Sequence, residues 1–288
     1  MGLRDIYPIE RTELKKIIVI TGASDGIGKE AAHQLQALGH QVVIVGRSSE
    51  KTRVVAEALS APYYVADFCK LDDVRKLAKH LIKDFDHIDV LVNNAGGIFG
   101  KRELTVDGHE KTMQVNHLAL FLLTNLLIDI LVKSKASIIN TSSIANRVLS
   151  DFDINDLELA NKYTSQKAYG NAKLENILFT KELHNRFHDL GITTAAFHPG
   201  NVASNFANDT NNLMKFAYHT PIKKIFLIPV SKGAETLVWL ADKSGDLDWQ
   251  SGEYYIKKKI SNKVDKKAFD PLIQKSLWNQ SAKFAELK

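Results

Sequence analysis

The sequence has almost no cysteine and no long unbroken hydrophobic run. Cys69 is the one cysteine among 288 residues, which excludes an intramolecular disulfide and favours a reducing compartment. The longest apolar stretch, residues 118–132, is too short to span a membrane and is interrupted by Asn125 and Asp129. Seven of the first 16 residues are charged, which argues against a signal peptide or a membrane anchor there. We therefore expect a cytoplasmic protein without a membrane span.

Charge is balanced except at the end of the chain. Charged residues make up 25% and hydrophobic residues 44% of the sequence, as in a globular protein with a large core. Residues 256–288 contain nine lysines and three acidic residues, and this excess accounts for the formal net charge of +5. A basic tail could contact nucleic acid or anionic lipid, but this one lacks interleaved arginines and any known binding motif. We predict a solvated, partly helical extension and no nucleic-acid partner.

A short strand followed by a glycine-rich turn lies near the start of the chain. Residues 16–21 are mostly β-branched, the turn at 21–28 reads TGASDGIG, and apolar residues at helical spacing continue to Gly39. A strand, a glycine turn and a helix N-terminus together predict a phosphate site, because the backbone can approach a pyrophosphate and the helix dipole faces its charge. The glycine spacing is Gly-x-x-x-Gly-x-Gly rather than the usual Gly-x-Gly-x-x-Gly.

The second expected strand, 41–45, is followed by an arginine where NAD-binding proteins usually have an acid. A carboxylate at this position holds the ribose 2′-hydroxyl of NAD. Here the position offers Arg47, and no carboxylate occurs before Glu50. Because a guanidinium suits a 2′-phosphate, the sequence favours NADP over NAD. A solvent-facing loop arginine is the alternative, and Asp25 adds negative charge near the expected phosphates.

Strands and amphipathic helices alternate along most of the chain. Further strands are expected at 62–66, 89–92, 137–141 and 193–197, and helices at 71–85, 108–133 and 163–187. This order predicts an α/β fold, a Rossmann-like doubly wound parallel sheet with helices on both faces and ligands at the carboxyl ends of its strands. Repeats, linkers and breaks in composition are absent from the sequence. We therefore expect one domain over 1–288, with its core at about 16–255.

The helix expected at 163–187 carries Tyr169 and Lys173, which lie four residues apart on one face. A free tyrosine titrates near ~10, and lowering its pKa to ~7 costs roughly 4 kcal/mol. One ammonium ~4 Å away in a partly buried site supplies about that much at an effective dielectric of ~20. The pair therefore suits a phenol that exchanges protons at neutral pH, although Tyr-x-x-x-Lys also occurs by chance on amphipathic helices.

Six motifs occur in one order along the chain. They are TGxxxGxG at 21–28, NNAG at 93–96, Asn116, Ser142-Ser143, YxxxK at 169–173 and Pro199-Gly200. Over about residues 16–255 this set resembles the short-chain dehydrogenase/reductase family, and the words VNHLALFLLTNLL, INTSS and AYGNAKLENILFTKEL look most like its retinol-dehydrogenase-like branch. The resemblance implies an oxidoreductase that transfers a hydride between NAD(P)H and a carbonyl or alcohol.

The resemblance also implies a catalytic set. Tyr169 would donate the proton to the carbonyl oxygen or accept it from the alcohol, and Lys173 would hold the nicotinamide ribose and lower the tyrosine pKa. Ser143 would position the substrate oxygen, with Ser142 as its possible substitute. Asn116 would anchor a water that relays protons to Lys173.

Cofactor contacts are implied in the same way. Asp67 would face the adenine and Asn94 the adenine ribose region. The remaining contacts are expected at Gly22, Ser24, Asp25, Gly26, Ile27, Gly28, Arg47, Ala95, Gly96, Tyr169, Lys173, Pro199, Gly200 and Val202.

The substrate is expected to be an apolar aldehyde or ketone. Segment 201–229 is rich in apolar residues and should lie over the substrate, although ordinary packing of two small helices is the alternative. The 26 residues from Ser143 to Tyr169 exceed the gap in compact members of the family, and the retinol-type branch shares this insertion. Members of that branch often have an N-terminal anchor, which we do not expect here, so a reductase outside retinoid metabolism is favoured.

Three other functions fit the sequence less well. An NADPH-binding redox sensor would share the fold with little turnover, but it would be expected to lack Tyr169 or Lys173. Epimerase or dehydratase relatives usually differ in glycine spacing and have a larger substrate domain. His184 and His188 could suggest a metal hydrolase, yet the glutamate of a zinc motif is missing, so no metal site is predicted. Family members often form dimers or tetramers, which makes a homo-oligomer one expectation.

Overall fold

The fold centres on one sheet of mainly parallel strands. The computed structural model describes residues 15–202, 228–243 and 245–287, and within them the strand order is β3-β2-β1-β4-β5-β6-β7-β8. The strands are β1 (Ile17–Thr21), β2 (Gln41–Gly46), β3 (Tyr63–Val65), β4 (Val90–Asn93), β5 (Ser137–Thr141), β6 (Thr193–His198), β7 (Glu253–Ile256) and β8 (Lys259–Ile260). Neighbouring strands are parallel except β7 and β8. The predicted doubly wound α/β sheet is confirmed.

The order of the strands reverses at β1. From β1 the chain runs outward to β2 and β3, then crosses back to place β4 on the other side of β1. In open α/β sheets such a reversal opens a crevice beyond the carboxyl ends of the two central strands, where ligands bind. We therefore expect a ligand site at the turns that follow β1 and β4.

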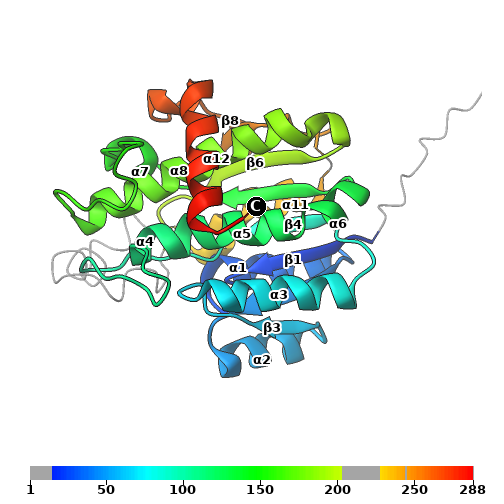
Figure 1. Ribbon diagram of the computed structural model, residues 1–288. Coiled ribbons are helices and arrows are strands. Elements are labelled where there is room, and N and C mark those ends of the chain that lie inside the picture. Colours follow the sequence, from blue (N-terminus) through cyan, green and yellow to red (C-terminus); the bar gives the residue numbers. More distant parts are fainter. Residues whose placement is uncertain (1–14, 203–227, 244, 288) are drawn as a thin grey trace, which may run out of the picture.

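Helices cover both faces of the sheet (Figure 1). One face carries α3 (Leu71–Asp84), α5 (Ala119–Leu126), α8 (Ser165–Phe187) and α12 (Pro271–Phe284), and the other carries α1 (Gly26–Ala37), α2 (Ser49–Ala58) and α11 (Val230–Asp242). Side chains of β1 alternate between the two hydrophobic clusters, with Val19 in one and Ile18 and Ile20 in the other. A strand buried on both faces explains why this stretch of sequence is continuously apolar.

The region expected as one helix, 108–133, is divided. It consists of α4 (Lys111–Met113), a π-helical turn (Gln114–Leu118), α5 and α6 (Ile128–Lys133). Asn116 lies in the π-helical turn, where its Nδ2 donates to the carbonyl oxygens of Thr112 and Gly97, each at 2.9 Å. Such turns are frequent at functional sites, and apolar periodicity alone does not reveal them.

The C-terminal segment contradicts part of the prediction for 256–288. Its lysines are exposed where the structure describes them, but α12 is not a solvated tail. Leu277 is 1% exposed and joins the same hydrophobic cluster as α8, which α12 crosses in Figure 1. The buried positions 274, 277, 281 and 285 follow helical spacing, so the signal for packing is present in the sequence.

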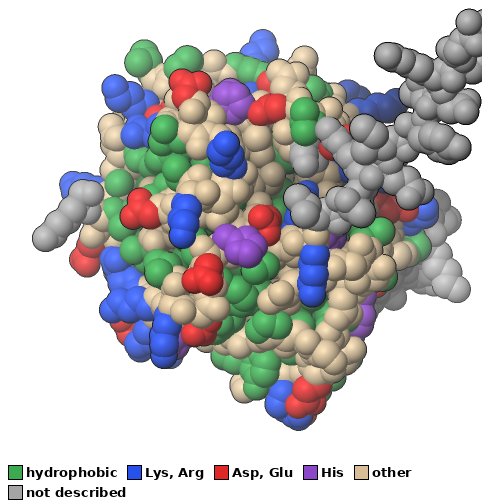
Figure 2. Space-filling view, turned by 90° about the vertical axis from the view of Figure 1, so that its right-hand side faces the viewer, with side chains coloured by type: hydrophobic (Ala, Val, Ile, Leu, Met, Phe, Trp, Pro, Cys, Tyr) green, Lys and Arg blue, Asp and Glu red, His purple; other side chains and the backbone are tan. Residues whose placement is uncertain are grey.

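Short helices and a mixed-charge surface make up the rest of the described structure. Short helices occur at α7 (Ala145–Val148), His188–Leu190 and Lys266–Phe269. Figure 2 shows the right-hand side of Figure 1, where basic and acidic side chains are interspersed as on an ordinary solvated surface. Among the described residues, no helix has the length and apolar character needed to cross a bilayer. Most of the segment expected over the substrate, 203–227, lies outside the described residues.

Candidate active site

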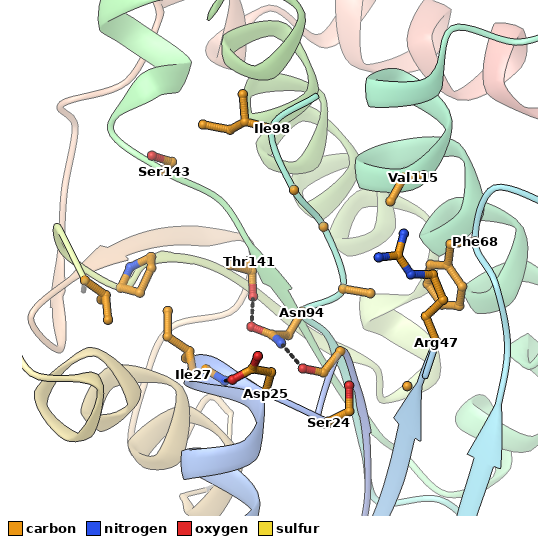
Figure 3. Close-up of a pocket in the computed structure, with 18 of the residues that line it drawn as sticks. Ser24, Asp25, Ile27, Arg47, Phe68, Asn94, Ile98, Val115, Thr141 and Ser143 are labelled. Carbon is orange, nitrogen blue, oxygen red and sulfur yellow. Dashed lines mark hydrogen bonds between the residues drawn. The ribbon is translucent and has the colours of Figure 1, made fainter. Parts of the chain in front are cut away.

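A cavity of about 590 Å³ lies at the carboxyl ends of the parallel strands β1 to β6 (Figure 3). Its lining includes most residues that the sequence singled out: Gly22, Ser24, Asp25, Gly26, Ile27, Arg47, Asp67, Asn94, Ala95, Gly96, Ser142, Ser143, Tyr169, Lys173, Pro199, Gly200 and Val202. Gly28 and Asn116 do not line it and lie directly behind the residues that do. The fold therefore brings motifs that are far apart in the sequence to one pocket.

The glycine turn after β1 packs so closely on the turn after β4 that side chains are excluded. Gly22 has a φ of +67°, and a Cβ there would lie 2.8 Å from the Cα of Ala95. A Cβ on Gly28 would lie 2.5 Å from the carbonyl oxygen of Gly22. Asp25 caps α1, accepting a hydrogen bond from the backbone N–H of Gly26 at 2.8 Å, and the first turn of α1 holds no acidic residue. This backbone cradle at a helix N-terminus fits a dinucleotide pyrophosphate.

Asn94 joins the ends of the central strands. Its Nδ2 donates to the carbonyl oxygen of Thr21 at 3.0 Å, and its backbone N–H donates to the hydroxyl of Thr21 at 2.9 Å. Its Oδ1 accepts from the hydroxyl of Thr141 at 3.4 Å (Figure 3). Because the protein already uses the polar atoms of this side chain, Asn94 shapes the cavity by fixing β1, β4 and β5 together.

The side chain of Arg47 extends beyond the carboxyl end of β2 (Figure 3). It is exposed and has no ion pair or hydrogen bond within the described ranges of the chain. Lys51, which also lines the cavity, lies 3.4 Å from Asp25 Oδ2.

Cys69 also lines the cavity. Burial raises the pKa of its thiol to about 11, so the thiol is protonated at neutral pH despite the nearby Arg47.

Tyr169 and Lys173 meet on the cavity side of α8. The Lys173 Nζ lies 5.4 Å from the centre of the Tyr169 ring and donates to the carbonyl oxygen of Thr141 at 3.3 Å. Lys173 is 2% and Tyr169 8% exposed. Burial lowers the pKa of Lys173 to about 7. Ile98 and Ala145 pack against Tyr169, so its ring also has apolar neighbours.

The two serines after β5 have different surroundings. The Ser142 hydroxyl donates to the carbonyl oxygen of Lys173 at 2.7 Å and is buried. Ser143 is half-buried, and its Oγ accepts from the backbone N–H of Ala145 at 3.2 Å, which leaves its hydroxyl proton available. Of the two, Ser143 has the geometry to donate a hydrogen bond to a ligand.

Asn116 is fully buried behind Gly96 and Gly97. Its side chain bonds to the backbone of Gly97 in both directions, donating at 2.9 Å and accepting at 3.1 Å. Its main-chain oxygen accepts from Asn176 Nδ2 at 3.1 Å. A carbonyl oxygen can accept a second hydrogen bond, so the water expected here stays a prediction.

Sequence reasoning missed several polar residues around the site. Asn176, His117 and His198 are buried, and His198 lines the cavity, where burial lowers its pKa to about 4. Asn176 lies three residues after Lys173, so its helical spacing already placed both side chains on one face. His184, one of the two histidines for which the sequence predicts no metal, has its Nδ1 2.9 Å from the Ser251 hydroxyl.

Comparison with known proteins agrees with this geometry. The family model described as short chain dehydrogenase matches residues 16–214. The chain belongs to the short-chain dehydrogenase family. This short-chain dehydrogenase is therefore an oxidoreductase, from a family that binds NAD or NADP and interconverts carbonyl and alcohol groups.

Similar proteins support the family across nearly the whole chain. The short-chain dehydrogenase is 34% identical over 273 residues to a Streptomyces protein that bears the name of a daunorubicin C-13 ketoreductase, covering 93% of this chain and 91% of that one. It is 33% identical over 303 residues to human retinol dehydrogenase 13, covering 98% and 88%. An uncharacterised protein from Mycobacterium paratuberculosis superposes with a TM-score of 0.75 at 26% identity, covering 95% and 94%. The resemblance to the retinol-dehydrogenase-like branch is confirmed.

Proposed function

We propose that this short-chain dehydrogenase uses NADP and interconverts an apolar aldehyde or ketone and its alcohol. The observation that carries the proposal is the meeting of Tyr169, Lys173 and Ser143 in the same cavity as the backbone cradle at the start of α1. Relatives named as a ketoreductase and as retinol dehydrogenases support carbonyl and alcohol chemistry. The apolar contacts of Tyr169 with Ile98 and Ala145 support an apolar substrate.

The cofactor preference rests on Arg47. A 2′-phosphate on the adenine ribose would bring two negative charges to the end of β2, where Arg47 has no acidic partner among the described residues. Asp67, at the end of the next strand, accepts a hydrogen bond from the backbone N–H of Cys69 at 3.0 Å. This bond holds the Asp67 carboxylate on the loop that would face the adenine.

Residues of the protein itself would transfer the proton. NADPH, when bound, would supply the hydride. Ser143 would donate a hydrogen bond to the carbonyl oxygen, and Tyr169 would deliver its phenolic proton to the same oxygen. The ammonium of Lys173 would stabilise the resulting phenolate, since a buried positive charge near a phenol favours its ionised form. Asn116 would hold Gly96 and Gly97 in place and anchor the water that returns a proton.

The test is oxidation of NADPH against aldehydes and ketones of increasing chain length, with NADH in parallel. Turnover should be faster with NADPH and with longer apolar substrates, and Tyr169→Phe should lower kcat by about 10³-fold or more while NADPH still binds. Equal activity in the phenylalanine variant, or a preference for the smallest polar carbonyls, would contradict the proposal. Tight NADPH binding without any turnover would instead favour the redox-sensor alternative.

Three expectations from the sequence remain proposals. We propose that the chain forms one domain, because helix α12 from the C-terminal segment shares a hydrophobic cluster with α8. A cytoplasmic location follows from the single cysteine. A homo-oligomer follows from the family resemblance, and sedimentation velocity of the purified protein would measure it.

A further inference from the structure

Lys173 shares its acceptor with a residue outside the expected catalytic set. Lys173 Nζ donates to the carbonyl oxygen of Thr141 at 3.3 Å, and Asn176 Nδ2 donates to the same oxygen at 3.1 Å. Asn176 Nδ2 also donates to the main-chain oxygen of Asn116 at 3.1 Å. Because carbonyl oxygens only accept, the amide orientation is fixed, and Asn176 Oδ1 points away from them as an acceptor.

His117 extends this chain of hydrogen bonds to helix α12. Its Nδ1 lies 3.3 Å from Asn176 Oδ1, and its Nε2 lies 2.8 Å from the hydroxyl of Ser281. Since Asn176 Oδ1 can only accept, the proton of the neutral ring is on Nδ1, and Ser281 must donate to Nε2. Burial lowers the pKa of His117 to about 4, so the ring is neutral at pH 7. Every donor in this series of hydrogen bonds therefore points from Ser281 toward the Thr141 carbonyl oxygen, which also accepts from Lys173.

A second link reaches the catalytic serine from the same C-terminal segment. The backbone N–H of Asp265 donates to Asn146 Oδ1 at 3.1 Å, and Asn146 Nδ2 donates to the carbonyl oxygen of Ser143 at 2.6 Å. A backbone donor on one side and a carbonyl acceptor on the other again fix the amide. Asn146 and Ser281 are both fully buried, so water does not compete for these bonds.

We propose that the C-terminal segment, residues 264–287, positions the catalytic side chains through these two buried links. Ser281, His117 and Asn176 fix the carbonyl oxygens around Lys173, and Asp265 with Asn146 fixes the backbone of Ser143. These are positioning residues, because none of them reaches the reacting atoms. The matched family model ends at residue 214, so Asp265 and Ser281 lie outside it, whereas their hydrogen-bond partners Asn146 and His117 lie within it. The proposal rests on the proposed function.

Ser281→Ala tests the longer link with a small change in volume. It should lower kcat about threefold to tenfold, the rate equivalent of one lost buried hydrogen bond, with each KM changed by less than about twofold. Ser281→Thr, which keeps a hydroxyl, should restore kcat. The matched control is Leu277→Ala, one turn earlier on α12, which should lower the melting temperature at least as much and leave kcat unchanged well below that temperature.

Asn146→Asp tests the shorter link, because it keeps the acceptor for Asp265 and loses the donor to Ser143. It should lower kcat when measured well below its melting temperature, and it should also lower that temperature, because it places a carboxylate in a fully buried site against a carbonyl oxygen. If kcat falls equally in Ser281→Ala and Leu277→Ala, or is unchanged in both Ser281→Ala and Asn146→Asp, the segment only stabilises the fold and the proposal is wrong. Absence of turnover in the unaltered protein would overturn the proposed function and this role together.

Discussion

Glu175 on α8 is fully buried, and neither carboxylate oxygen has a hydrogen-bond partner in the described residues. Burial, together with the negative charges of Glu110 and Glu158, raises its pKa well above the ordinary value of 4.5. The folded protein then keeps a proton that the unfolded chain releases, so its stability falls as the pH rises above that value. We therefore expect the buried Glu175 side chain to destabilise the folded protein at high pH.

Glu175→Gln removes this loss without changing the side chain's shape. We expect the variant to be more stable by on the order of 1–2 kcal/mol at pH 8 and not at pH 4, measured by thermal unfolding across that range. Glu182 is the control on the same helix, because it is paired with Arg186 at 2.7 Å. Glu182→Gln should not stabilise the protein at pH 8. If Glu175→Gln stabilised the protein as much at pH 4 as at pH 8, the explanation would be wrong.

Arg47 is the second residue whose role can be measured. Arg47→Ser should weaken NADPH binding about tenfold to a hundredfold, because a charge-assisted hydrogen bond contributes ~1.5–3 kcal/mol. NADH binding should change little, since NADH lacks the 2′-phosphate. Fluorescence titration of both cofactors gives the comparison. Arg53→Ser is the control, because Arg53 pairs with Glu57 at 2.8 Å and does not line the cavity.

At the scale of the element, the turn before α1 depends on a glycine inside the helix. By helix propensity alone, alanine at position 28 would stabilise α1 by about 1 kcal/mol relative to glycine. Its Cβ would, however, lie 2.5 Å from the Gly22 carbonyl oxygen and 2.6 Å from Asn94 Nδ2, so the turn would have to move. We expect the clash to dominate, and Gly28→Ala to weaken dinucleotide binding at least about tenfold in a titration. Gly39→Ala meets no atom within 4 Å and should leave binding unchanged, although its φ of +94° strains alanine there and lowers the stability of the protein.

Elements with a strong local signal were predictable, and those set by distant contacts were not. The strands β1 to β6 agree with the sequence prediction within one residue at each end, because short runs rich in β-branched or aromatic residues mark them. The π-helical turn around Asn116 was not predicted, since it depends on contacts with Gly97. Helix α8 begins at Ser165 rather than 163, because the Thr164 hydroxyl caps it by accepting from Lys167 at 3.1 Å. The catalytic motifs could be recognised in the sequence. The hydrogen bond between His117 and Ser281 could not, because it joins residues 164 positions apart.

At the scale of the whole molecule, α12 belongs to the main hydrophobic cluster although it lies in the lysine-rich end of the chain. Leu277→Ala should therefore lower the free energy of unfolding by about 2–4 kcal/mol, as for a core leucine. Leu272 on the same helix is 76% exposed, and Leu272→Ala should change stability by less than about 0.5 kcal/mol. Denaturant unfolding measures both. If both variants changed the free energy of unfolding only slightly, the end of the chain would unfold separately from the sheet.

The two outer strands of the sheet are short. The strand β3 has three residues and β8 has two, and Lys257, Lys258 and Lys259 lie at the turn into β8. An open sheet exposes unpaired N–H and C=O groups along its outer strands, which can pair with another chain. Short outer strands and a group of lysines make such pairing unfavourable. The protein can thus leave the cavity end of its sheet open to ligands while its sides resist aggregation.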